Sequence, residues 1–150
     1  MDQVCLGTQV GGMSVDNEAA RWPASPQMAP VAVVVLEHTE HAVDTHWDLL
    51  IARGPDPAGL WGARCARRPD TAPPGAAMPL ERTEDHSRAW LSREGSVSGG
   101  RGVATRCVAG LLRVDLEGRA VVRWDDGRTA RWTLRGDAAS PTLMVDELTP

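Results

Sequence analysis

The chain has no lysine, no phenylalanine and no tyrosine in its 150 residues. All 16 basic residues are therefore arginines, and six tryptophans supply every aromatic side chain. Because acidic residues outnumber the arginines and the formal net charge is −4, the composition argues against a protein that coats nucleic acid by bulk electrostatics, although it allows a local basic patch. The length suits one domain with a single hydrophobic core.

Cysteine and long apolar runs are also scarce. Cys5, Cys65 and Cys107 lie far apart, are odd in number and form no CxxC pair, which argues against a disulfide framework or a zinc ribbon. No apolar run approaches the roughly 18 residues that a membrane span needs, and no secretory signal pattern opens the chain. We therefore expect a soluble protein of the reducing cytoplasm.

The first 29 residues show no sustained period of 2 or 3.6 and carry scattered glycine, proline, serine and asparagine. Such a segment buries too little apolar surface to offset the entropy lost on ordering. We expect a flexible, disordered N-terminal tail over residues 1–29, followed by one domain over residues 30–150.

Short apolar stretches closed by turn residues follow this tail. The strands expected from them are 31–37, 46–53, 60–65, 103–109, 111–117, 120–126 and 130–136. Residues 67–79 read as a proline-rich loop, residues 80–95 as a short helix or an irregular segment, and residues 96–102 as a glycine-rich turn. Asp126-Gly127 marks a hairpin, and the C-terminal residues could add an edge strand. The pattern predicts a mainly β fold, a small closed or partly open β-barrel, with a sandwich as the alternative.

Residues 37–48, EHTEHAVDTHWD, hold three of the four histidines and four carboxylates. In a strand over 46–53, His46 and Asp48 share one face, and His38 can fold back beside His46 if the two strands are antiparallel. Two imidazoles and a carboxylate suit a catalytic divalent metal such as manganese, iron or zinc. The alternative is a solvated acidic loop in which His46 and Asp48 form a surface pair.

The fourth histidine, His86, precedes the glycine-rich turn that contains Arg101. Backbone amides of such a turn and an arginine fork can hold an anion, although a hairpin turn with a solvated arginine has the same pattern. From residue 86 to residue 135 ten arginines stand against five acidic residues, a net charge of +5 that could follow a phosphate backbone. Trp90, Trp124 and Trp132 could stack on bases or, at period 2, fill the core.

Four pieces occur in order: a strand ending in LEH, then HWDLL, then EDH four residues before an aromatic, then EGSVSGGRG. Over roughly residues 31–135 they resemble the 3′-phosphoesterase domain of bacterial DNA ligase D and its small stand-alone relatives. The resemblance implies a compact β-barrel that uses a divalent metal, typically manganese, to remove a 3′-ribonucleoside or 3′-phosphate from DNA ends during repair. It also implies DNA 3′ ends and end-joining repair proteins as partners.

By this resemblance His46 and Asp48 match metal ligands, and His86 matches a histidine that contacts the phosphate. The first histidine ligand is either His38, with a two-residue insertion, or His41, with a one-residue deletion. We favour His38 because its LEH context continues the strand.

Three positions depart from the family. Leu50 stands where ligase D domains carry a phosphate-binding arginine, Trp90 where they usually carry tyrosine, and Leu36 where they carry glutamine. Neither a leucine nor a tryptophan can replace the contact that the family residue makes.

The leading hypothesis is a metal-dependent phosphoesterase acting on nucleic-acid 3′ ends. His38, His46 and Asp48 would hold the metal, while His86 and Arg101 would stabilise charge on the phosphoryl oxygens. One alternative is a catalytically weak or inactive barrel that docks DNA or a repair protein through its arginine-rich strands. Another is an unrelated metalloenzyme acting on a small phosphorylated or carboxylated metabolite, because fold alone does not determine function.

Overall fold

A computed structural model describes residues 18–41, 44–54, 59–97 and 99–150. The strands are β1 (Val31–His41), β2 (Asp44–Ala52), β3 (Leu60–Cys65), β4 (Ala77–His86), β5 (Gly95–Ser96), β6 (Val103–Val114), β7 (Ala120–Trp124), β8 (Thr129–Gly136) and β9 (Pro141–Thr149). A single turn of 3₁₀-helix, η3 (Arg88–Leu91), follows β4. The expected mainly β fold is confirmed. No helix within the described ranges has the length and apolar character needed to cross a membrane.

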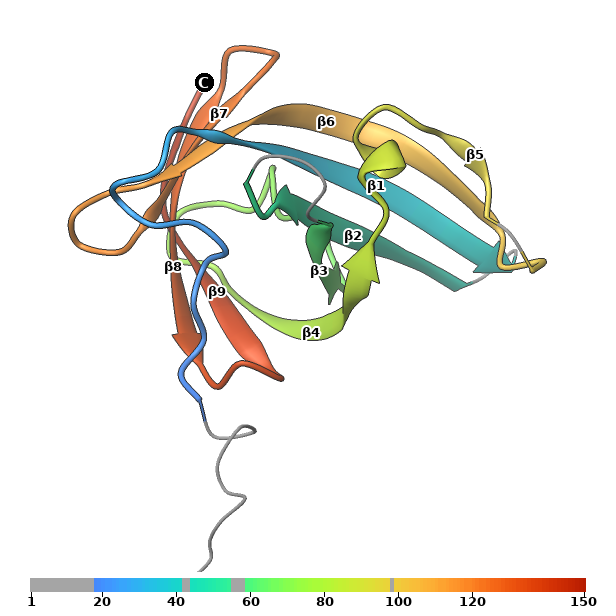
Figure 1. The fold of residues 1–150 in the computed structure, drawn as a ribbon, viewed down its shortest axis with the longest axis horizontal. Helices are drawn as coiled ribbons and strands as arrows, with labels where there is room; N and C mark the ends of the chain where they lie inside the picture. The colour runs from blue at the N-terminus through green and yellow to red at the C-terminus, as the bar shows by residue number, and fades with distance from the viewer. Residues whose placement is uncertain (1–17, 42–43, 55–58, 98) are drawn as a thin grey trace, which may run out of the picture.

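Eight of the strands close into an antiparallel barrel. Their order is β1-β2-β3-β4-β9-β8-β7-β6, and β6 pairs back with β1, while the two-residue β5 adds to the start of β6. Figure 1 shows the long β1 and β6 side by side, with the other strands completing the ring. The expected closed barrel is therefore present. The C-terminal strand β9 is not an edge strand, because it pairs with both β4 and β8.

Strand β4 lies where the sequence pattern predicts the end of a loop and a helix or irregular segment. Met78 and Leu80 are buried and alternate with exposed neighbours, which is the period of a strand with one face on the core. The prediction is wrong for residues 77–86, because the prolines before Ala77 mask an alternation that is only a few residues long, whereas the short helix expected within residues 80–95 forms as η3.

Strand β6 continues through Gly110, where the sequence pattern predicts a break between two strands. A Cβ at Gly110 would come within 2.9 Å of Trp124 Cα on β7, so the glycine permits close approach of a neighbouring strand. The glycine is a packing requirement rather than a turn.

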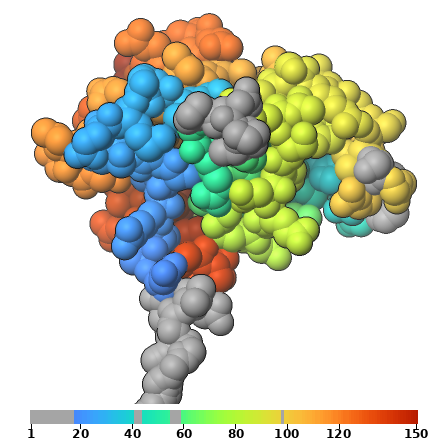
Figure 2. Space-filling model, in the orientation of Figure 1, coloured from blue at the N-terminus to red at the C-terminus, as the bar shows by residue number. Residues whose placement is uncertain are grey.

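The expected tail over residues 1–29 is wrong for its second half, because residues 18–29 pack on the barrel. The Trp22 ring is buried, with its centroid 6.1 Å from those of both Trp61 and Trp132. The Ala20 amide also donates to the Gly136 carbonyl, at 2.9 Å. Figures 1 and 2 show this blue segment lying between the red-orange and green strands. The buried Trp22 ring and these backbone contacts attach the segment to the barrel, and residues 1–17 lie outside the described ranges.

Tryptophans fill much of the interior. Trp61, Trp124 and Trp132 are at most 3 % exposed, and the Trp124 and Trp132 ring centroids lie 5.9 Å apart. Trp124 and Trp132 therefore belong to the core, which excludes them as base-stacking platforms. Their bulk replaces the missing phenylalanine and tyrosine.

Candidate metal centre

The histidine cluster lies on two paired strands. In the antiparallel β1–β2 ladder His38 stands directly opposite His46, and Leu36 stands opposite Asp48. Residues two apart on one strand face the same side, so His46 and Asp48 point together toward His38. β1 extends to His41 and β2 begins at Asp44, so His38 and His46 both lie within strands rather than in a loop.

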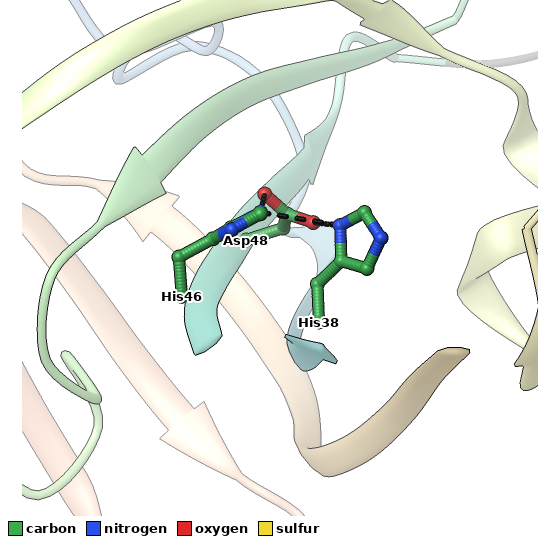
Figure 3. A group of neighbouring side chains, drawn as sticks. All are labelled: His38, His46 and Asp48. Carbon is green, nitrogen blue, oxygen red and sulfur yellow. Dashed lines mark hydrogen bonds and ion pairs between the residues drawn. The ribbon is translucent and has the colours of Figure 1, made fainter. Parts of the chain in front are cut away.

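The three side chains turn their polar atoms toward one point, as Figure 3 shows. His38 Nδ1 lies 3.2 Å from His46 Nε2 and 3.5 Å from Asp48 Oδ2, and His46 Nε2 lies 3.3 Å from Asp48 Oδ1. Ligands about 2.0–2.2 Å from a common cation stand about 2.8–3.6 Å apart at octahedral to tetrahedral angles. The donor set and its spacing therefore fit a divalent transition metal.

The cluster is shielded from water. The side chains of His38, His46 and Asp48 are only 12 %, 11 % and 10 % exposed. The alternative of a solvated surface pair is therefore wrong. The other candidate ligand, His41, ends β1, and its side chain lies outside the described part of the structure.

The second ring nitrogen of His38 is also engaged. His38 Nε2 lies 2.6 Å from the backbone carbonyl oxygen of Arg101 in the glycine-rich turn. Histidines that bind metals commonly donate their other N–H to a carbonyl in this way. The glycine-rich turn, expected from the sequence to hold an anion, thus also contacts a candidate metal ligand.

Electrostatics favour a neutral His46 imidazole. Burial lowers the pKa of His46, nearby Asp48 opposes this, and the positive charge of Arg64 lowers the pKa further. A neutral imidazole offers the lone pair that a metal needs.

The predicted site residues line one cavity of about 340 Å³. His38, His46 and Asp48 form part of its wall, and His86 and Arg101 line it as well. His86 lies at the end of β4 and Arg101 just before β6, far from the cluster in the sequence. The barrel therefore brings all five residues to one place.

A bulge in β4 aims His86 into this cavity. The β3–β4 register shifts between Leu60, which pairs with His86, and Gly62, which pairs with Thr83. Thr83 and His86 consequently both lie over Gly62, where a Cβ would come within 2.7 Å of Thr83 Oγ1 and 2.8 Å of His86 Nδ1. Both of these atoms are buried without a hydrogen-bond partner among the described residues. Gly62 leaves the room that His86 needs.

Of the three positions at which the sequence differs from the ligase D phosphoesterase domains that it resembles, two line the cavity and one does not. Trp90 of η3 and Leu36 of β1 contribute apolar surface to the wall. Leu50 is fully buried in the core, so it cannot contact an anion there.

The sequence interpretation missed Arg64. This residue pairs with Asp48 across the β2–β3 ladder, lines the cavity and lies 4.0 Å from the Glu40 carboxylate. Its side chain is 43 % exposed, so solvent can reach the guanidinium. The segment LWGARC alone does not show that Arg64 faces the cluster, because this depends on the pairing of β3 with β2.

Arg64 on β3 and His86 on β4 thus line the same cavity as the His38–His46–Asp48 group. Comparison with protein-family models and with curated proteins found no match.

Proposed function

We propose that this protein is a divalent-metal-dependent phosphoesterase that processes the 3′ ends of DNA in end repair, with manganese as its metal. One observation carries the proposal: the donor atoms of His38, His46 and Asp48 lie within 4.8 Å of one another, in the same cavity as His86 and Arg101. His38, His46, Asp48 and His86, to which the resemblance gives roles in metal or phosphate binding, line this one cavity.

His38, His46 and Asp48 would hold the metal through two ring nitrogens and a carboxylate. A divalent metal bound there supplies Lewis-acid polarisation of the phosphoryl group. The protein contributes a largely buried site, in which electrostatic interactions are stronger than in water.

The remaining polar groups of the cavity would bind the phosphoryl oxygens. His86 presents its ring from the end of β4, while Arg64 and Arg101 provide positive charge. Arg64 matters because the family's arginine position is Leu50 here, buried in the core. We infer that Arg64 supplies from β3 the charge that Leu50 cannot supply from β2.

The first test compares manganese binding in the wild type, His46→Ala and His86→Ala by elemental analysis and calorimetry. His46→Ala removes a ligand, and we expect its affinity to fall more than 100-fold, beyond the roughly 10–100-fold typical of groups that only support a ligand. His86→Ala is the matched control, since it changes a histidine of the same cavity outside the ligand set.

The second test measures phosphate release from an oligonucleotide with a 3′-phosphate. We expect both variants to lose turnover, although only His46→Ala loses the metal. Metal-dependent turnover that His46→Ala leaves unchanged would contradict the proposal.

A DNA-binding module without catalysis is the second candidate. The observation that favours it is the exposed position of Arg113, Arg123 and Arg135 on β6, β7 and β8. This function predicts DNA binding that needs no metal, persists in His46→Ala and weakens steeply with salt, together with turnover no greater than background.

A further inference from the structure

The contact between the glycine-rich turn and His38 determines which ring nitrogen of His38 can face the metal cluster. A carbonyl oxygen only accepts hydrogen bonds, so the short contact from Arg101 O requires a proton on His38 Nε2. In a neutral imidazole Nδ1 then has a free lone pair. This is the atom that lies 3.2 Å from His46 Nε2 and 3.5 Å from Asp48 Oδ2.

Gly102 allows the Arg101 carbonyl to come this close. Its φ of +90° is favoured only for glycine, and a Cβ there would overlap the Thr39 carbonyl oxygen and lie 2.6 Å from Glu40 Cα. No side chain can occupy this space without pushing the turn away from β1.

The turn is closed by a hydrogen bond of its own backbone and leads directly into a strand that pairs with β1. The Val97 amide donates to the Gly102 carbonyl at 2.8 Å. Immediately after the turn, Val103 and Ala104 of β6 pair with Thr39 and His38 of β1. The position of the Arg101 carbonyl is therefore set by the backbone that carries His38 itself.

We propose that the backbone carbonyl of Arg101 positions His38 as a metal ligand through its Nδ1 atom, and that Gly102 is the positioning residue that makes this possible. The inference rests on the proposed metal site. It assigns the glycine-rich turn a role that its sequence does not indicate, since the turn acts here through a hydrogen-bond acceptor rather than through amides that hold an anion.

The chain offers a matched control in the same turn. Gly100 also has a positive φ, +70°, but a Cβ there meets nothing within 4 Å. Gly100→Ala therefore imposes the backbone strain of a left-handed alanine without forcing the turn away from β1, whereas Gly102→Ala does both.

The experiment first reads the proton position of His38 by long-range ¹H–¹⁵N NMR correlation in metal-free, ¹⁵N-labelled protein. We expect the proton on Nε2 alone in the wild type and in Gly100→Ala, and a mixture of the two tautomers in Gly102→Ala. Calorimetry with manganese chloride then gives the affinities. We expect Gly102→Ala to bind roughly 10–100-fold more weakly than the wild type, and Gly100→Ala to bind like it.

Three results would overturn the inference. The first is a proton on Nδ1 of His38 in the wild type, a measurement that needs no variant to fold. The second is a single tautomer and unchanged manganese affinity in Gly102→Ala. The third is an equal loss of affinity in Gly100→Ala, which would assign the effect to strain in the turn.

Failure of the metal site itself gives a different pattern. In that case the wild type and His46→Ala bind manganese equally weakly, whatever the tautomer of His38. If His46→Ala loses binding and Gly102→Ala keeps it, only the positioning role is wrong.

Discussion

Asp48 and Asp70 are both buried carboxylates, at 7 % and 0 % exposure, but their partners differ in kind. The Asp70 carboxylate accepts hydrogen bonds from Arg68 at 2.6 and 3.0 Å and from Arg128 at 2.9 Å. Burial alone would raise the pKa of Asp70, but the bonds from Arg68 and Arg128 outweigh it and lower that pKa. Asp70 is thus an ion held by fixed positive charges, and it ties the segment after β3 to the β7–β8 hairpin.

The Asp48 carboxylate instead faces the imidazoles of His38 and His46. Burial lowers the pKa of His46, so this imidazole does not carry a full positive charge at neutral pH. A buried carboxylate beside an imidazole that lacks a full positive charge gains from a cation, whereas one already held by two guanidinium groups does not. The comparison teaches that the identity of the partners, rather than burial itself, separates a structural carboxylate from a candidate ligand.

The largest expected effect comes from Asp70→Asn. We expect the free energy of unfolding to fall by about 3 kcal/mol, because two arginines lose their shared carboxylate; this is the low end of the usual range since Arg68 is 37 % exposed. Urea denaturation at pH 7 measures the change. The pKa of Asp70 is lowered by folding, so the difference from the wild type should shrink as the pH falls below about 4. A loss below 1 kcal/mol would mean that Asp70 is not the structural ion described here.

Manganese is expected to stabilise Asp70→Asn against unfolding but not Asp48→Asn. At 100 times its dissociation constant, the ion should raise the free energy of unfolding by about 2.7 kcal/mol in the wild type and in Asp70→Asn. Asp48→Asn should show no such gain, because the asparagine amide lacks the negative charge of the carboxylate that would bind the metal. Urea denaturation with and without manganese measures the effect, and equal gains in all three proteins would place the metal elsewhere.

Asp48→Asn in metal-free protein is expected to change stability much less than Asp70→Asn. We expect a shift of less than about 1 kcal/mol in either direction, because the variant removes a buried charge along with its two imidazole contacts. The same denaturation series provides the measurement. A loss as large as that of Asp70→Asn would show that Asp48 stabilises the fold as strongly as Asp70 does.

The smallest expected effect is on thiol reactivity in a Cys5→Ser background. Burial and the charge of Asp48 raise the pKa of Cys65 to about 12. Cys107 is only partly buried. Burial raises the pKa of its thiol as well, but the positive charge of Arg68 opposes this rise. Alkylation followed by mass spectrometry at pH 8 should label Cys107 at least roughly tenfold faster. Faster labelling of Cys65 would contradict the burial of its thiol on β3.

The raised pKa of Cys65 also affects stability in alkali. Between its ordinary value of 9.0 and about 12, only the unfolded chain loses this thiol proton, so the free energy of unfolding should fall as the pH rises through that range. Denaturation of Cys65→Ala beside the wild type separates this contribution from other alkaline effects.

Local patterns predict much of the barrel, because a strand with one buried face alternates on a scale of a few residues. Strand β3 lies where the sequence pattern predicts it, and the β7–β8 hairpin forms at Asp126-Gly127. The pattern fails where one contact decides the structure. Trp22 orders residues 18–29 by packing between Trp61 and Trp132, which no period in that segment reveals.

The candidate site shows the same division. Alternation within one strand indicates that His46 and Asp48 share a face, and the short separation of His38 from them indicates that it can join. Arg64 could not be placed, because its position beside Asp48 depends on the β2–β3 register. The same holds for the Arg101 carbonyl, which meets His38 only because β6 closes the barrel against β1.

The sequence by itself determined the class of fold, the position of several strands along the chain and the candidate ligands of a metal site, because side-chain alternation and residue chemistry are local properties. Only the tertiary structure decided that His86, Arg64 and the glycine-rich turn surround those side chains in one cavity. Barrel closure pairs strands far apart in the chain, and the register of each pair determines which residues meet.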